Sequence, residues 1–304
     1  MADVRIATRR SQLAVWQASF VKGELERAHP GLEVALVGLS TAGDRWLDAP
    51  LSEVGGKGLF VNELEAALLR GDADLAVHSM KDVPAQLSDG FTLPVIAYRE
   101  DVRDAWISPH GRLDEIRSGA VVGSSSLRRQ AQILAVRPDL EVRPIRGNVD
   151  TRLTKLDAGE FDAIVLAMAG LRRLGWADRA DEAISVTRCL PAAGQGALGI
   201  ECLDGNERIM GLLAPLRDPV TAACVTAERG VSAALGADCS LPLAAYAELR
   251  EDRIWLRALL ASPDGKALLR AEARHRSVEE VVSAVVADLN ALGAADLLEQ
   301  MSVQ

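Results

Sequence analysis

The first two-thirds of the chain alternate short apolar runs with segments whose apolar residues recur every three or four positions. The short runs predict buried strands, and the helical spacing predicts amphipathic helices. Strands are predicted at residues 4–7, 34–37, 75–77, 120–122, 141–145 and 163–167, and helices around Leu13, Trp16 and Phe20 and at residues 59–69, 127–136 and 151–156. Such alternation is typical of α/β domains with parallel sheets.

From about Asp218 the pattern changes. A predicted helix at residues 221–235 precedes three strand-like runs, at 243–248, 254–260 and 267–274, and a final amphipathic helix at 278–292. We therefore predict two doubly wound α/β domains around a cleft, followed by a small α+β domain. The predicted domains are residues 1–98 with 197–215, residues 103–191, and residues 218–304. A cleft between the first two is the expected ligand site.

Composition narrows the class of protein. Of the 304 residues, 49% are hydrophobic and 25% are charged, as in ordinary globular proteins, and the net charge of −9 argues against a nucleic-acid partner. No signal-like start or membrane-length apolar run is found, so we expect a cytoplasmic protein. The four cysteines form no Cys-x-x-Cys pair, which argues against zinc and redox motifs; they are Cys189, Cys202, Cys224 and Cys239.

Polar and charged residues follow the apolar run 75–77. Residues 78–84 read His-Ser-Met-Lys-Asp-Val-Pro, which places Lys81 and Asp82 together. Ligands of open α/β sheets bind outside the carboxyl ends of strands, and unpaired charges are costly to bury. The stretch therefore indicates a functional site, although taken alone a polar loop closed by Pro84 fits equally well.

Arginines recur where predicted strands end. The clearest case is residues 123–129 (Gly-Ser-Ser-Ser-Leu-Arg-Arg), where a helix N-terminus, hydroxyl groups and guanidinium forks would together bind an anion. One such arginine would more simply be a solvated surface residue. Several at strand ends, in an acidic protein, favour a polyanionic ligand. The remaining arginines of this pattern are Arg9, Arg10, Arg146, Arg152, Arg172 and Arg173.

Three other features suggest functions that the sequence does not support. Residues 55–58 (Gly-Gly-Lys-Gly) lack the spacing of a phosphate-binding loop, which argues against an ATPase. Residues 194–199 match the dinucleotide pattern Gly-x-Gly-x-x-Gly, but they precede a strand-like run, so we interpret them as a crossing between domains. His78 has no second metal ligand at a useful spacing, and we interpret it as a hydrogen-bonded structural histidine.

Seven segments, within residues 5–250, occur in the order seen in one enzyme family: residues 7–11, 54–60, 77–84, 125–130, 146–153, 169–173 and 190–197. They resemble the porphobilinogen deaminases, also called hydroxymethylbilane synthases. The last part of the chain resembles this family only in general character. The resemblance implies two domains like those of periplasmic binding proteins, a third domain, and a monomeric transferase.

The resemblance also implies an activity. These enzymes deaminate porphobilinogen and join four molecules head-to-tail into the linear tetrapyrrole hydroxymethylbilane, in haem and chlorophyll-type biosynthesis. A dipyrromethane cofactor, linked to one cysteine, primes the chain, and by position this is Cys239. That residue lies in a polar loop of small residues, whereas Cys202 and Cys224 fall in predicted strand and helix, where thiols are commonly buried and inert. Cys189 is less clear.

The implied roles follow from the charges of the ligands. Asp82, beside Lys81, would stabilise the positive charge left on a pyrrole when ammonia departs. The predicted cofactor-binding residues are Cys239, Lys57, Ser79, Lys81, Asp82, Ser124, Ser126, Arg128, Arg129 and Arg152, and the predicted substrate-binding residues are Arg9, Ser11, Phe60, Arg146, Arg152, Arg173 and Gln195. Porphobilinogen is the expected partner, with no metal, nucleic acid or membrane.

The chain departs from the family pattern at a few positions. Glu53 replaces a frequent lysine, Asp150 a usual glycine, and Ala237-Asp238 a common pair of glycines, with consequences that the sequence leaves open. Ser124 replaces a frequent threonine and keeps the hydroxyl group.

Two other classes of protein share some of these features. A solute-binding protein would need the cleft and the arginines but neither Cys239 nor Asp82. A phosphoryl-transfer enzyme would need a metal-binding carboxylate cluster, which we do not find in the sequence.

Overall fold

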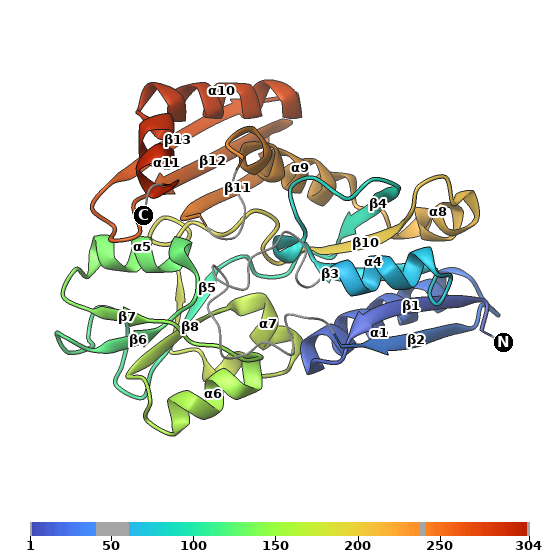
Figure 1. Ribbon diagram of the computed structural model, residues 1–304, viewed down its shortest axis with the longest axis horizontal. Helices are drawn as coiled ribbons and strands as arrows, with labels where there is room; N and C mark the ends of the chain where they lie inside the picture. The colour runs from blue at the N-terminus through green and yellow to red at the C-terminus, as the bar shows by residue number, and fades with distance from the viewer. Residues whose placement is uncertain (1, 41–60, 237–240, 303–304) are drawn as a thin grey trace.

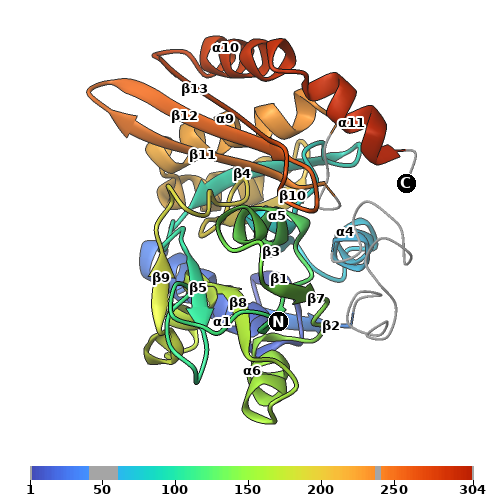
Figure 2. The ribbon, with the colours of Figure 1, turned by 90° about the vertical axis from the view of Figure 1, so that its left-hand side faces the viewer.

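The computed structural model describes residues 2–40, 61–236 and 241–302, which form two five-stranded sheets and one three-stranded sheet (Figure 1). The two larger sheets have helices on both faces, and the third lies with its helices at the C-terminal end of the chain (Figures 1 and 2). The fold is therefore two α/β units followed by an α+β unit, as the sequence predicts. The exact domain boundaries stay a prediction.

The first sheet has the order β2-β1-β3-β10-β4. Its strands are β1 (Val4–Arg9), β2 (Val34–Leu39), β3 (Leu75–Ser79), β4 (Phe91–Ala97) and β10 (Leu198–Leu203). Alternate residues of β1 face opposite ways, as the period of a strand requires. Ile6 packs with the helix α1 (Gln12–Ala28), and Ala7 packs with α4 (Asn62–Leu69) on the other face.

The second sheet has the order β7-β6-β8-β5-β9. Its strands are β5 (Asp104–Ile107), β6 (Val121–Gly123), β7 (Glu141–Arg143), β8 (Ala163–Ala167) and β9 (Glu182–Ile184). One face packs against α5 (Leu127–Val136) around Ile133. The other packs against α6 (Val149–Asp157) and α7 (Met168–Arg173) around Leu153 and Leu171.

Both large sheets are mixed, so the expectation of parallel sheets is wrong in part. Strand β10 runs antiparallel to β3 and β4, and β5 runs antiparallel to β8 and β9. These antiparallel strands arise because the chain crosses from the first sheet to the second after β4 and returns to the first sheet as β10. Sequence periodicity did not reveal β4, β5 or β9, since β4 contains a proline and the other two span only four and three residues.

The third sheet is antiparallel and joins β11 (Leu243–Arg250), β12 (Arg253–Ala261) and β13 (Leu268–His275). Its apolar face packs against α9 (Pro219–Ala234) and α10 (Val278–Ala291). In β12, Ile254 and Leu256 belong to this core, whereas Arg253, Trp255 and Arg257 are more exposed. The outer face of the sheet is therefore rich in arginine.

Short helices complete the described part of the chain: η1 (Met80–Asp82), η2 (Ala177–Arg179), α8 (Glu207–Leu213), η3 (Ala214–Leu216) and α11 (Ala294–Ser302). Among the described helices, none is by itself long and apolar enough to cross a membrane. Helices α10 and α11, taken together across a 71° bend, pass that test by length and composition alone.

Candidate functional site

Lys81 and Asp82 follow strand β3 directly, at the carboxyl end of the first sheet. The chain leaves β3 at Ser79 and turns directly into η1, which contains both residues. The turn is anchored on each side. The Ser79 hydroxyl accepts a hydrogen bond from Gln17 Nε2 (2.8 Å), and the Met80 amide donates to the carbonyl of Ala197 (3.0 Å). The backbone that leads into Lys81 and Asp82 is therefore held at a defined place.

A buried pair lies directly behind this turn. His78 Nε2 is 2.8 Å from Glu201 Oε2, and both side chains are almost inaccessible to solvent. Burial raises the pKa of the neighbouring Glu65, which the charge of Glu201 raises further. The prediction of a hydrogen-bonded structural histidine is confirmed, and its partner joins β3 to the adjacent strand β10.

Arg128 and Arg129 lie in the helix that follows strand β6 of the second sheet. After Gly123 the serines lead into α5, and the Ser126 hydroxyl caps this helix by accepting from the Arg129 amide (3.5 Å). A Cβ at Gly123 would lie 3.0 Å from both Ile164 and Phe161, so a larger residue would crowd this turn. Both arginines are buried, with exposed fractions of 3% and 6%.

Asp104, which the sequence analysis did not single out, is the shared partner of these two arginines. It is inaccessible to solvent, and its carboxylate accepts from Arg128 Nη1 (2.8 Å) and Arg129 Nη2 (2.7 Å). Burial alone would raise the pKa of Asp104, but the two guanidinium groups hold it well below its ordinary value. The one available signal was an acidic residue placed immediately before the apolar triplet 105–107.

Charged residues at the carboxyl ends of the two sheets affect one another's pKa values. The pKa of Lys81 is lowered by burial and by Arg129, and Asp82 offsets part of this effect. The pKa of Arg152 is lowered to about 10, by burial first and then by Arg129 and Arg146, and again Asp82 acts in the opposite direction. The carboxylate from the first sheet and the cations from the second therefore lie within electrostatic range of each other.

The start of α6 positions Arg152. Its Nε donates to the carbonyl of Gly147 (2.8 Å), in the loop that precedes α6. Gly147 has φ +108°, and a Cβ there would lie 2.7 Å from Thr151, so the loop requires glycine. Arg146 precedes this glycine and is partly buried, which lowers its pKa.

Two predicted substrate-binding residues tie together the connections between the sheets. Arg173 Nη2 donates to the carbonyls of Gly196 (2.6 Å) and Tyr98 (3.1 Å). Gln195 Nε2 donates to the carbonyl of Val102 (2.7 Å), and it also contacts Asp104. These bonds join the segment that leaves the first sheet after β4 to the segment that returns to it before β10. Direct contact of Arg173 or Gln195 with substrate stays a prediction.

The other predicted residues are placed as follows. Arg9 ends β1 and Ser11 caps α1 by accepting from the Ala14 amide (3.4 Å), so both lie at the carboxyl end of the first sheet. Ser124 is buried, and its hydroxyl accepts from the Ser126 amide (3.2 Å). Lys57, Phe60 and Cys239 lie outside the described residues, as do Glu53 and Asp238.

The three described cysteines are buried and free. Burial raises the pKa of Cys189 to about 12, and those of Cys202 and Cys224 to about 11. A thiol with such a pKa is protonated at neutral pH and is a poor nucleophile. Within the described ranges, we find no group of three or more His, Cys, Asp or Glu residues that could hold a metal ion.

Known proteins resemble this chain in sequence and, more weakly, in structure. Among solved structures, the methionine binding protein MetQ has 12% identity and a TM-score of 0.42, with 72% of this chain and 91% of that chain covered. The aliphatic sulphonate binding protein SsuA from Escherichia coli has 13% identity and a TM-score of 0.41, with 76% and 70% covered. The periplasmic VFT2 domain of BvgS from Bordetella pertussis has 16% identity and a TM-score of 0.38, with 69% and 84% covered.

Two family models cover most of the sequence. Residues 4–211 match the family described as "Porphobilinogen deaminase, dipyromethane cofactor binding domain", and residues 222–291 match "Porphobilinogen deaminase, C-terminal domain". The first match spans every described residue of the site, from Arg9 to Gln195. The chain therefore belongs to the porphobilinogen deaminase family.

Proposed function

We propose that Cys239 carries the dipyrromethane cofactor and that Asp82, Lys81, Arg129 and Arg152 form the site at which the chain is extended. The family activity is hydroxymethylbilane synthesis, in which four porphobilinogen molecules are deaminated and joined. The observation that carries the proposal is the common electrostatic environment of Asp82 and the cations of the second sheet.

The described side chains fit a ligand with several carboxylates. Arg152 donates through Nε to a backbone carbonyl, and within the described residues no carboxylate pairs with it. Arg128 pairs with Asp104, but its buried Nε has no hydrogen-bond partner among the described residues. A partly buried cation without a counter-charge, such as Arg152, is costly, so an acetate or propionate group would stabilise it. Lys81, Arg129 and Arg152 would hold those groups.

The bound cofactor supplies an electron-rich pyrrole carbon to which the first substrate molecule is joined. The aminomethyl C–N bond of porphobilinogen breaks, ammonia leaves, and positive charge develops on the pyrrole. When the new C–C bond forms, the attacked pyrrole carbon loses its proton to solvent, which removes that charge. Asp82 is fixed at the end of β3 and stabilises that charge. Lys81 and Arg152 bind the carboxylates and keep the substrate oriented, and Gln195 and Arg173 hold the crossings on which the site depends.

Cellular context belongs to the same proposal. We place the enzyme in the cytoplasm, as a monomer that binds neither nucleic acid nor membrane. The free thiols of Cys189, Cys202 and Cys224 support a reducing compartment. Gel filtration coupled to light scattering tests the monomer, and limited proteolysis tests the boundaries at residues 98–103, 191–197 and 215–218.

Mass spectrometry of the intact protein tests the cofactor assignment. The parent protein should exceed its sequence mass by two linked pyrrole units, and Cys239→Ala should remove both this excess and the activity. Cys202→Ala and Cys224→Ala serve as matched controls, because their thiols are buried, and both should keep the adduct. An adduct on a peptide without Cys239 would refute the assignment.

A further inference from the structure

The open end of the third sheet carries a second group of arginines, far along the chain from the first. Strands β11 and β12 are joined by Glu251 and Asp252, whose φ values of 49° and 59° are those of a tight hairpin turn. The turn brings Arg250 opposite Arg253, and the register of β13 brings Arg274 opposite Trp255.

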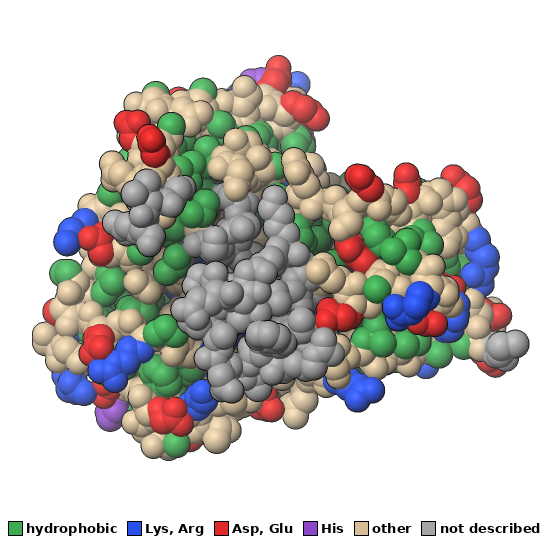
Figure 3. Space-filling view, in the orientation of Figure 1, with side chains coloured by type: hydrophobic (Ala, Val, Ile, Leu, Met, Phe, Trp, Pro, Cys, Tyr) green, Lys and Arg blue, Asp and Glu red, His purple; other side chains and the backbone are tan. Residues whose placement is uncertain are grey.

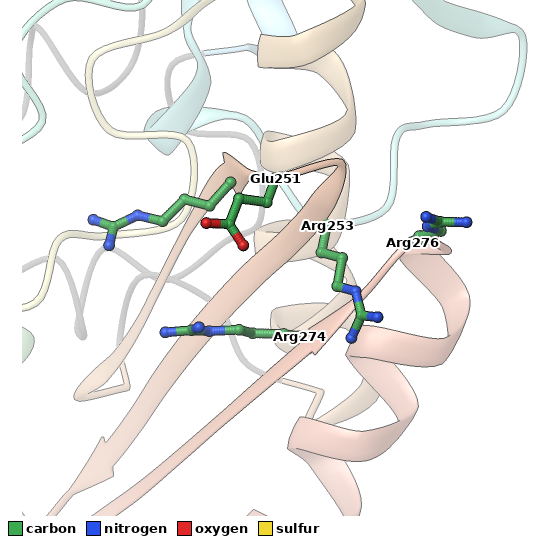
Figure 4. A pocket seen from close by; sticks show the side chains of 5 residues that line it. Glu251, Arg253, Arg274 and Arg276 are labelled. Carbon is green, nitrogen blue, oxygen red and sulfur yellow. The ribbon is translucent and has the colours of Figure 1, made fainter.

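These arginines line a hollow of about 410 Å³, which is within the usual size range of small-molecule sites. Its lining is Arg250, Glu251, Arg253, Arg274 and Arg276 (Figure 4). Figure 4 shows the side chains of Arg253, Arg274 and Arg276 spread around the end of the hairpin instead of converging on one point. One small anion could not contact all of them, whereas an extended ligand with several anionic groups could.

The hollow is unusual in its charge. The chain has a net charge of −9, and acidic and basic side chains are interspersed over the face in Figure 3. Arginines elsewhere, such as Arg117 and Arg137, pair with carboxylates. Arg253, Arg274 and Arg276 pair with no carboxylate of the described residues, and Glu251 is the one acidic residue of the lining. Like charges so close together repel one another, and an anionic ligand would relieve that repulsion.

Trp255 stacks against two arginines of the lining, Arg250 and Arg274, and against the neighbouring Arg257. The guanidinium carbons of Arg250, Arg257 and Arg274 lie 4.3, 4.0 and 4.7 Å from its ring centroid. Arg250 and Arg257 also pair with Glu248, whereas Arg274 pairs with no carboxylate of the described residues. The guanidinium of Arg274, stacked on the ring, therefore keeps edge donors that match a carboxylate in geometry.

We propose that this hollow binds the carboxylates of a linear tetrapyrrole after it leaves the catalytic site. The inference rests on the proposed function, whose product carries an acetate and a propionate on each of its four pyrroles. Guanidinium groups bind carboxylates in bidentate fashion, and the spread of the arginines matches a ligand with many carboxylates. The hollow shares no residue with the site around Asp82, so it is a separate binding place for the same chemical class.

Equilibrium dialysis of the cofactor-loaded enzyme against uroporphyrin tests this proposal. Uroporphyrin is a stable compound with an acetate and a propionate on each of four pyrroles. The double variant Arg274→Ala/Arg276→Ala should lose one class of binding site, with affinity there falling about tenfold, since an exposed pair contributes up to about fivefold per arginine. Arg270→Ala is the matched control, because this exposed arginine of β13 is not part of the lining.

The remaining measurements separate the possible outcomes. The double variant should make hydroxymethylbilane at the parental rate, because neither residue belongs to the catalytic site. If the parent were inactive and lacked the cofactor, the proposed function would fail; if it were active but both proteins bound uroporphyrin equally, only the present inference would fail. Tripolyphosphate should not compete at equal concentration. Equal competition by this anion would identify an unselective cationic surface and would also overturn the inference.

Discussion

The two α/β sheets have the same strand pattern but carry different charged side chains at their carboxyl ends. In each, three parallel strands are followed by an antiparallel strand and an edge strand, and β1 and β6 hold equivalent places. Each of these strands leads to a helix capped by a serine, Ser11 or Ser126. The first sheet then supplies Asp82 at the end of β3, and the second supplies the arginines around α5 and α6. The same strand pattern therefore places a carboxylate at the end of one sheet and a group of arginines at the end of the other.

The position of the arginines relative to the helix cap explains how the two sheets differ. Arg9 and Arg10 precede Ser11 and remain at least partly exposed. Arg128 and Arg129 follow Ser126, inside the first turn of α5, and are buried. Buried cations require a counter-charge, and the second sheet provides Asp104. A local shift of an Arg-Arg pair by a few residues thus changes a partly exposed pair into part of the core.

The largest expected effect comes from removing that counter-charge. Asp104→Ala leaves Arg128 and Arg129 buried without their shared carboxylate, which should lower the free energy of unfolding by about 3–5 kcal/mol. Urea unfolding at neutral pH measures the loss. The pKa of Asp104 is depressed in the folded protein, so its contribution is present above the ordinary carboxyl pKa and is lost as the pH falls toward the folded value. Glu141→Ala, which removes a surface partner of Arg143, is the control and should change little; an equal loss in both variants would contradict a special role for Asp104.

The carboxylate of the first sheet should affect the rate and not the stability. Asp82→Asn keeps the size of the side chain and removes its charge, so elongation should slow by about 10²–10³-fold. Single-turnover addition of porphobilinogen, followed by mass measurement of the enzyme–pyrrole intermediates, gives the rate of each step. Asp82→Glu should retain more activity than Asp82→Asn. Parental rates in the Asn variant would mean that Asp82 is structural.

The sequence revealed the chemistry of the first sheet better than that of the second. The segment at residues 78–84 carries its carboxylate and lysine side by side, and local pattern suffices to find them. Asp104 acts on residues 24 and 25 positions away, through a strand too short to leave a periodic signal. The same limit hid β4 and β9 and the antiparallel direction of β5 and β10, because strand direction depends on the long crossings between the sheets and not on local spacing.

Replacing Arg152 should have a different effect from replacing Asp104: activity should fall, whereas stability should not. It is a cation without a carboxylate partner among the described residues, and burial lowers its pKa to about 10, so the folded protein disfavours its charge. Arg152→Leu should therefore leave the free energy of unfolding unchanged or raise it. Elongation should nevertheless weaken by about 10–150-fold, the equivalent of one charge-assisted hydrogen bond of roughly 1.5–3 kcal/mol. Denaturation and steady-state kinetics on the same preparation test both parts. Large destabilisation with normal kinetics would assign Arg152 to the core.

The charge of Lys81 can be tested through the pH dependence of the reaction rate. Burial and the neighbouring arginines lower its pKa, so its charge is lost at a lower pH than that of an ordinary lysine. The rate should fall on the alkaline side as Lys81 loses its proton. The ordinary pKa of arginine is well above that of lysine, so Lys81→Arg should move the alkaline fall in kcat/KM to higher pH. If the fall stayed where it is in the parent enzyme, another group would be responsible for it.

The smallest effects concern the helix caps that the two sheets share. Ser11 and Ser126 each accept a backbone hydrogen bond, at 3.4 and 3.5 Å, which is long for this contact. Replacing either serine by alanine should therefore cost about 0.5–1 kcal/mol of unfolding free energy, the lower part of the range for such caps. Threonine can accept the same bond and should restore stability at both positions. Equal losses would support equivalent scaffolds. A loss at Ser126 alone would mean that its hydroxyl matters chiefly for holding Arg129 in the core, and the equivalence of β1 and β6 would then be one of topology without shared energetics.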